Sequence, residues 1–182
     1  MTISRILALL PALCLLCACE KVDVEATGDD PSIAHERPTS LGEGTQSSPY
    51  TVPQVLSGEA ATGTTTWVIG YAVGSTYRTM SNALFSAATT YTSNILLAES
   101  PSCTTTASCI AIELSSSTIQ QSLSLAHNPQ GYRQCIMVCG QMSRYFSQPG
   151  IRNVKSGYWL PNFDPSTLDS SPTTWDEKEQ QY

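Results

Sequence analysis

The stretch "TTWVIGYAVGSTY" (residues 65–77) decides how the chain can fold. It is rich in β-branched and aromatic residues, which pack well on a pleated sheet. Gly70 and Gly74 interrupt it at points where a strand would bend or bulge. The segment therefore predicts a long, curved strand, around which the rest of the domain can be arranged.

Two shorter apolar runs follow this strand along the chain. "NILLAES" (residues 94–100) and "CIAIEL" (residues 109–114) are joined by a connection rich in Pro, Ser and Thr. Short apolar runs separated by such residues are typical of a β-hairpin. In the next segment, "SSSTIQQSLSLAHNP" (residues 115–129), Ser or Thr caps precede the apolar positions and Asn128-Pro129 ends the run, so we expect a short helix.

The domain ends in a second predicted hairpin. "QCIMVCGQMSRYF" (residues 134–146) and "GIRNVKSGYWL" (residues 150–160) read as two strands around the turn "SQPG". Pro149 and Gly150 suit the two central positions of a type II turn. The predicted fold class is thus all-β with one short helix, in the order β-β-β-α-β-β. This is the order of the OB-fold, a five-stranded Greek-key barrel.

Several blocks of the chain resemble a known domain family. "YTVPQVL", "WVIGYAVG", "SNALFSAATTYTSNILLAES", "CIAIELSS" and "YFSQPGIRNV" are similar to successive blocks of an OB-fold domain in uncharacterised envelope lipoproteins of Bacteroides-type bacteria, and more distantly to OB-fold domains beside extracellular nucleases. The resemblance covers residues 49–158. It departs at both tails and at Cys135 and Cys139, where polar residues are expected. It implies no catalytic residues.

The first residues have the three parts of a secretory signal. Arg5 is followed by an apolar run that is too short to span a bilayer and then by small residues. "LCAC" (residues 16–19) resembles the lipobox of bacterial lipoproteins, in which the cysteine receives the lipid. Cleavage before Cys14 or Cys17 would put a bulky leucine at the −1 site, so we predict Cys19 as the lipidated residue. The alternative is an ordinary cleaved signal followed by a free cysteine.

Lipidation of Cys19 would attach the chain to a membrane. Glu20 follows the cysteine in place of the aspartate that retains many lipoproteins at the inner membrane, so the outer membrane is the expected location. The acidic residues Asp23, Glu25, Asp29 and Asp30 resemble the export tag of surface lipoproteins. The cell surface and the periplasmic face remain alternatives.

Charge divides the chain into parts. Residues 20–48 hold 7 acidic and 2 basic residues, and residues 161–182 hold 5 acidic and 1 basic. The middle, residues 49–160, holds 3 acidic and 5 basic residues, so the acidic pI describes the tails. We expect a signal peptide over residues 1–18, a disordered acidic tether over residues 19–48, an OB-fold domain over residues 49–160 and a partly disordered acidic tail over residues 161–182.

Four cysteines remain beyond Cys19, and an oxidising compartment permits a disulfide. Cys103 and Cys109 flank "TTTAS", so we predict that they form a bridge across this hairpin. Cys135 and Cys139 lie four residues apart on one predicted strand, about 13 Å, which is too far for a disulfide. We expect both to be reduced on one face of the strand. A metal site formed by these two cysteines and His127 is the weaker alternative, because no fourth ligand is evident.

The sequence contains no recognisable catalytic motif. There is no phosphate loop, nucleophile elbow or metalloprotease motif. His35 and His127 have no acidic or nucleophilic partner in a shared motif. Glu99 and Glu113 could form an acid pair, although strand glutamates usually belong to the polar face of a sheet. We therefore expect a non-catalytic binding module without a metal or cofactor.

The expected ligand face is the one that OB-folds habitually use, formed by the second and third strands and flanked by the first loop and the last hairpin. The predicted loop over residues 75–93 and the last hairpin carry aromatics with arginines, which suit stacked sugar rings or bases with anionic groups. The expected ligand is a glycan, including an acidic one. The alternatives are single-stranded nucleic acid, weakened by having only five basic residues in the domain, and a structural envelope-protein partner. The candidate residues are Tyr77, Arg78, Arg144, Tyr145, Phe146, Arg152 and Lys155, with Phe85 and Tyr91 beside them; alternatively, their rings fill the core.

Overall fold

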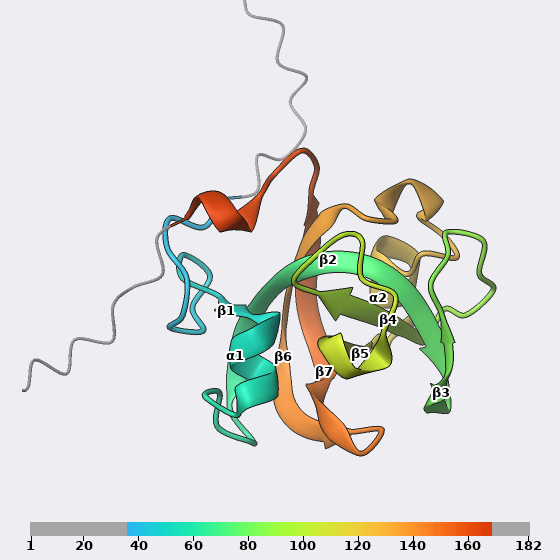
Figure 1. Cartoon of the computed structure of the whole chain (residues 1–182), viewed down its shortest axis with the longest axis horizontal. Coiled ribbons are helices and arrows are strands. Elements are labelled where there is room, and N and C mark those ends of the chain that lie inside the picture. The colour runs from blue at the N-terminus through green and yellow to red at the C-terminus, as the bar shows by residue number, and fades with distance from the viewer. Residues whose placement is uncertain (1–35, 169–182) are drawn as a thin grey trace, which may run out of the picture. The chain divides into compact units, whose positions relative to one another are not determined.

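A computed structural model describes residues 36–168 of the chain (Figure 1). The predicted signal peptide, Cys19 and most of the predicted tether and tail lie outside the described residues. Within residues 36–168 the fold is one sheet of seven strands with two α-helices. The all-β class predicted from the sequence is confirmed.

The central strand is β2 (Thr65–Tyr77), which arches across the molecule (Figure 1). Its first half pairs antiparallel with β6 (Cys135–Tyr145), and its second half pairs antiparallel with β4 (Asn94–Ala98). The register with β4 shifts between Ala72 and Gly74, so the bulge expected near Gly74 is present. β2 thus links the part of the sheet that contains β6 to the part that contains β4.

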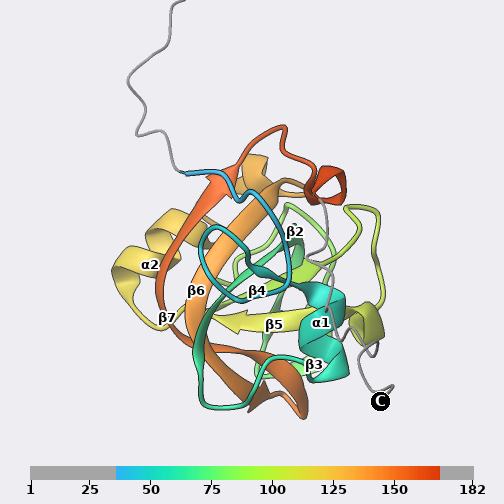
Figure 2. The ribbon, with the colours of Figure 1, turned by 90° about the vertical axis from the view of Figure 1, so that its left-hand side faces the viewer.

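The remaining pairings close these two parts of the sheet into a ring. β4 pairs antiparallel with β5 (Cys109–Glu113), and β5 pairs parallel with β7 (Gln148–Leu160). β7 in turn pairs antiparallel with β6, which returns to β2. Figure 2 shows β6 and β7 side by side in this ring. The ring runs β2, β4, β5, β7, β6, and its helix α2 (Ser117–Leu123) comes between β5 and β6 in the sequence, as predicted.

The ring encloses the main apolar core. Alternate residues of β4, β5 and β6 point inward, and all are fully buried: Ile95, Leu97, Ile110, Ile112, Ile136 and Val138. Leu123 of α2 packs against the same core. Alternation of this kind places the intervening residues on the outer surface of the ring, where the candidate site is built.

A helix that the sequence analysis did not predict packs against the barrel core. α1 (Val52–Ser57) follows the two-residue strand β1 (Tyr50–Thr51) and inserts Val52 and Val55 into the core. Thr51 and Gln54 form a reciprocal capping box, and Gly58 ends the helix in the left-handed conformation. These caps satisfy backbone groups that the short helix could not pair by itself.

The first predicted loop, residues 75–93, is partly a strand. β2 extends through Tyr77, and β3 (Thr79–Leu84) turns back beside it in an antiparallel pair. Only Arg78 connects the two strands, with a positive φ of 63°. The loop prediction is therefore wrong for its first half.

The turn predicted at Pro149 and Gly150 is also misplaced. β6 and β7 are connected by Phe146 and Ser147, whose φ values of 51° and 71° are in the left-handed region, as a type I′ hairpin requires. Pro149 and Gly150 lie within β7. A Cβ on Gly150 would lie 2.6 Å from the carbonyl oxygen of Ala111, so this glycine permits the close parallel approach of β5.

Segments from both flanks of the domain pack on its outer surface. Leu41, from the predicted tether, is buried in a cluster with Ile69 and Met137, and Phe163 and Leu168 pack against the same cluster. The backbone N–H of Trp67 donates to the carbonyl oxygen of Gly44 at 2.8 Å, which holds this segment beside β2. Residues 36–48 are thus packed on the barrel in the structure. No helix among residues 36–168 has the length and apolarity needed to cross a membrane.

Candidate functional site

A groove of about 380 Å³ opens where several elements of the sheet meet. The β2–β3 turn, the start of β4, the end of β5, helix α2 and the β6–β7 hairpin all contribute to it. We call it the hairpin groove. It is lined by Tyr77, Arg78, Ser93, Asn94, Glu113, Leu114, Ser115, Gln120, Tyr145 and Phe146.

The first wall of the hairpin groove is the β2–β3 turn. Tyr77 is 42% exposed, and its ring stacks on Tyr91 with 5.6 Å between centroids and 24° between planes. The guanidinium carbon of Arg78 lies 4.8 Å from the centroid of the Tyr77 ring. A partly exposed aromatic residue and a cation are therefore held together at this edge.

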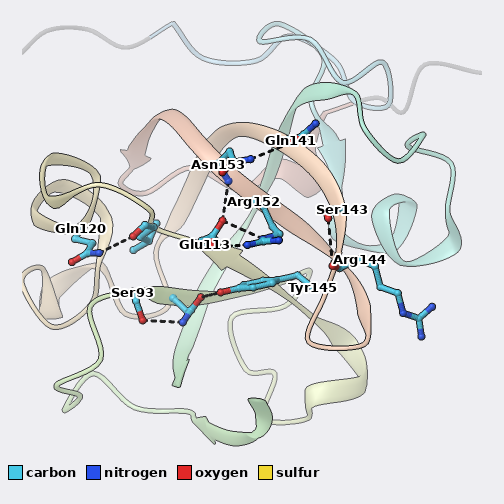
Figure 3. A network of polar contacts seen from close by, with 11 residues as sticks. Ser93, Glu113, Gln120, Gln141, Ser143, Arg144, Tyr145, Arg152 and Asn153 are labelled. Carbon is cyan, nitrogen blue, oxygen red and sulfur yellow. Dashed lines mark hydrogen bonds and ion pairs between the residues drawn. The ribbon is translucent and has the colours of Figure 1, made fainter. Parts of the chain in front are cut away.

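The opposite wall is the β6–β7 hairpin. The Tyr145 and Phe146 rings stack with centroids 4.0 Å apart, and the Arg152 guanidinium lies 5.2 Å from the Tyr145 centroid. The Tyr145 hydroxyl donates to Asn94 Oδ1 at 2.6 Å, and the Asn94 amide donates to Ser93 Oγ (Figure 3). Burial, together with the charge of Glu113, raises the pKa of Tyr145, so this phenol is a neutral donor at physiological pH.

The floor contains an ion pair between two strands. Arg152 of β7 binds Glu113 of β5 through two contacts, Nη2 to Oε1 at 3.1 Å and Nε to Oε2 at 3.3 Å. The backbone N–H of Asn153 donates to the same carboxylate at 3.2 Å. These contacts fix the orientation of the Glu113 carboxylate, and a carboxylate has room for a further donor.

The structure brings five of the seven predicted ligand residues to the hairpin groove. Tyr77, Arg78, Tyr145 and Phe146 line it, and Arg152 reaches it through Glu113 and the Tyr145 ring. The other two lie elsewhere. Arg144 extends away from the groove (Figure 3) and lines a separate hollow with Pro149, and Lys155 is exposed farther along β7. Neighbouring residues on a strand point to opposite faces, which separates Arg144 from Tyr145.

The middle of the expected ligand face is covered by the chain itself. On the outer side of β4 and β5, Leu96, Ala98, Cys109 and Ala111 are fully buried. Residues of β3 and the segment after it pack over them, and a Tyr132 hydroxyl donating to the Phe85 carbonyl oxygen holds this cover in place. The middle of the expected ligand face is thus filled by the chain's own side chains. Only its end, at Asn94 and Glu113, remains open. The covering residues are Met80, Ala83, Phe85, Cys103, Tyr145 and Phe146.

Sequence reasoning missed the polar residues of the groove. Asn94 and Gln120 carry no distinguishing motif: Asn94 begins β4, and Gln120 lies in the middle of α2. The sequence suggests a role for Glu113 only as a partner of Glu99. The two carboxylates do not meet, because Asn94 pairs with Glu113 in the sheet register and Glu99 follows the other end of β4.

The cysteines fall into two groups. The Sγ atoms of Cys103 and Cys109 lie 3.6 Å apart as thiols, so the two residues are close but not bonded, and the disulfide stays a prediction. Cys135 and Cys139 are thiols on one face of β6, opposite Tyr71 and Trp67. Burial raises the pKa of Cys135 to about 12, which makes its thiol unreactive.

The described residues contain no group of three or more potential metal-ligating side chains. His127 Nδ1 lies 2.8 Å from Ser124 Oγ, beside the end of α2. The alternative of a site shared with Cys135 and Cys139 therefore has no geometric support in residues 36–168.

Comparison with known protein families identifies the domain at the level of a family. A family model described as a domain of unknown function, DUF6359, matches residues 50–160. These limits coincide with the start of β1 and the end of β7. No curated protein and no solved structure gives a significant match.

Proposed function

Because the chain belongs to the DUF6359 family, whose description names no activity, we propose from the geometry of the hairpin groove that the domain is a non-catalytic binding module for glycans. We further propose that its ring is a variant of the OB-fold barrel. The ring order, the parallel β5–β7 closure and the helix before β6 support this assignment. The additional strands β1 and β3 would be elaborations of it.

The observation that carries the proposal is the pair of aromatic walls. Each wall of the hairpin groove is a stacked ring pair with a guanidinium over one ring. Between the walls lie oxygen acceptors and hydroxyls that can bind sugar hydroxyls: Glu113, Gln120, Ser93 and Ser115. Binding pockets typically combine apolar and aromatic walls with a few placed polar groups.

Single-stranded nucleic acid is the second candidate, because bases also stack on aromatic rings. A strand of phosphates requires several cations along its path. In the hairpin groove one of the two guanidiniums is already paired with Glu113. This favours a glycan. A structural envelope-protein partner is the remaining alternative.

The location is part of the same proposal. We propose that the domain is attached through lipidated Cys19 to the outer membrane, on its surface or on its periplasmic face. A tethered module in the cell envelope would encounter extracellular or cell-wall glycans. This rests on the sequence of residues 1–30.

The proposal is tested with a glycan array and single-stranded oligonucleotides, using the full chain in detergent at two salt concentrations. Tyr77→Ala should weaken glycan binding about tenfold, as expected for loss of an aromatic contact. Leu84→Ala is a matched control, because Leu84 is 40% exposed on β3 but does not line the groove. Equal affinity of wild type and Tyr77→Ala would exclude the groove. Binding to no glycan would refute the proposal.

A further inference from the structure

The two arginines of the hairpin groove differ in how their charge is balanced. Arg152 is paired with Glu113 through two hydrogen bonds. Arg78 is exposed and has no carboxylate partner among residues 36–168. Its guanidinium rests only on the neutral Tyr77 ring. The groove therefore carries one uncompensated positive charge, at its β2–β3 edge.

The backbone at Arg78 is unusual for an arginine. Its φ of 63° lies in the left-handed region, where glycine and asparagine are the favoured residues. Such conformations carry a cost and concentrate at binding sites. Glycine or asparagine would adopt this one-residue turn more easily, but neither carries a guanidinium.

Neighbouring contacts fix this turn. Thr76 Oγ1 donates to the Thr79 carbonyl oxygen, and Asn82 Nδ2 donates to the Tyr77 carbonyl oxygen at 2.7 Å. The Tyr77 ring stacks on the Tyr91 ring, which restricts its movement. The cation and the aromatic face are thus preorganised toward the groove, which reduces the ordering cost of binding.

The floor sets a limit on the charge of the ligand. The Glu113 carboxylate faces the groove with its side chain 21% exposed. It would repel a second anionic group close to it but can accept a hydroxyl. A ligand that places hydroxyls over Glu113 and a single anionic group at Arg78 is therefore complementary to both parts of the hairpin groove.

We infer that the hairpin groove selects acidic saccharides, with the carboxylate or sulfate of one sugar residue bound by Arg78 while that sugar residue or its neighbour contacts the exposed part of Tyr77. This inference rests on the proposed glycan-binding function and names its ligand class. Tyr77 supplies the ring contact and Arg78 supplies the discrimination between acidic and neutral sugars. Arg152 acts by orienting Glu113 and the Tyr145 ring.

The test compares matched acidic and neutral probes by calorimetry on the full chain in detergent. The probes are 3′-sialyllactose with lactose, and 6-sulfo-N-acetyllactosamine with N-acetyllactosamine, so that each acidic probe carries a single anionic group and differs from its neutral counterpart by the acidic substituent. Wild type should bind an acidic probe about tenfold more tightly than its neutral counterpart, as one charge-assisted contact provides. This ratio should fall as salt rises.

The variants separate charge from fold. Arg78→Asn retains a residue that tolerates the left-handed turn, so circular dichroism should be unchanged while the acidic-to-neutral ratio falls to about one. Arg144→Asn removes an arginine that points away from the groove and should keep the wild-type ratio.

Each outcome bears on a different statement. Glycan binding with equal affinity for acidic and neutral probes would overturn the inference and leave the proposed function intact. An acidic preference that survives in Arg78→Asn would also overturn it. Failure to bind any of the four saccharides would refute both, and tighter binding to oligothymidylate than to the acidic probes would assign the groove to nucleic acid.

Discussion

The Tyr145 hydroxyl donates to Asn94 Oδ1 at 2.6 Å, between residues 51 positions apart in the chain. This bond attaches the β6–β7 hairpin to the start of β4, where the hairpin groove opens. Asn94 is only 4% exposed, and its amide donates to the Thr76 carbonyl oxygen and to Ser93 Oγ. A single buried amide thus joins three elements that line the site.

Removal of this hydroxyl should destabilise the domain. In Tyr145→Phe the Asn94 oxygen loses its donor in a buried position, which costs about 1–3 kcal/mol. The free energy of unfolding from urea titration measures the loss. Tyr77→Phe serves as the control, because the Tyr77 hydroxyl is exposed and makes no hydrogen bond to residues 36–168, so its stability should be unchanged. Equal stabilities of the two variants would contradict this role of Asn94.

Oxidation should join Cys103 to Cys109. Their Sγ atoms lie 3.6 Å apart, and closing a loop of about seven residues should stabilise the fold by about 2 kcal/mol on the chain-entropy scale. Peptide mapping without reductant should recover the linked pair. Reductant should lower the free energy of unfolding of wild type and of Cys139→Ala, but not of Cys103→Ala/Cys109→Ala. A peptide that links Cys103 to Cys135 or Cys139 would disprove the pairing.

Stability should decrease between pH 10 and pH 12 through Tyr71. Burial, with a further contribution from the hydrogen bond to Asp164, raises its pKa from 10.0 to about 12. The folded state keeps the phenol proton in this range while the unfolded state loses it, so the stabilisation is complete below pH 10 and is lost as pH rises to 12.

Denaturant titrations at a series of pH values test this assignment. The free energy of unfolding of Tyr71→Phe should fall less steeply with pH than that of wild type. The decline that remains comes from other tyrosines whose pKa is raised, such as Tyr145 and Tyr158. Asp164→Asn removes the hydrogen-bonded carboxylate and should give an intermediate slope. Identical pH profiles for wild type and Tyr71→Phe would exclude Tyr71 as the titrating group.

Radiolabelled palmitate should enter the wild-type protein and not Cys19→Ala. The variant lacks the thiol that the predicted lipobox presents, so it should also remain unprocessed. Labelling followed by gel electrophoresis measures both. Cys17→Ala retains the modified cysteine and should be labelled like wild type. Comparable labelling of Cys19→Ala would disprove the lipobox assignment.

Most of the ring could be predicted because its strands are apolar on one or both faces. The runs at residues 65–77, 94–98 and 109–113 are each recognisable without knowledge of their partners. Helix α1 and strand β3 could not be predicted in this way. α1 has only six residues and depends on the Thr51–Gln54 caps, and β3 can pair with β2 because Gly74, which has no Cβ, lets the backbone of Leu84 and Phe85 approach closely.

The sequence predicted which types of residue form the site, namely aromatics and arginines, but not how they are arranged. Aromatics near arginines indicated the predicted loop over residues 75–93 and the last hairpin, and five of the seven residues do meet at the groove. Alternation along the predicted strand already places Arg144 and Tyr145 on opposite faces, but the sequence could not indicate which of the two faces the groove, because the phase of a strand depends on its register with β7. It also could not indicate that the middle of the expected face is filled by Phe85 and its neighbours.

The double pairing of β2 also has a kinetic consequence. Its first half meets β6 through pairs such as Thr65 with Gln141 and Tyr71 with Cys135, which lie far apart in the chain. The ring therefore cannot close until the last hairpin has been synthesised, and contacts of such long range slow folding. In a nascent chain the edge of β2 that pairs with β6 would therefore stay unpaired until then.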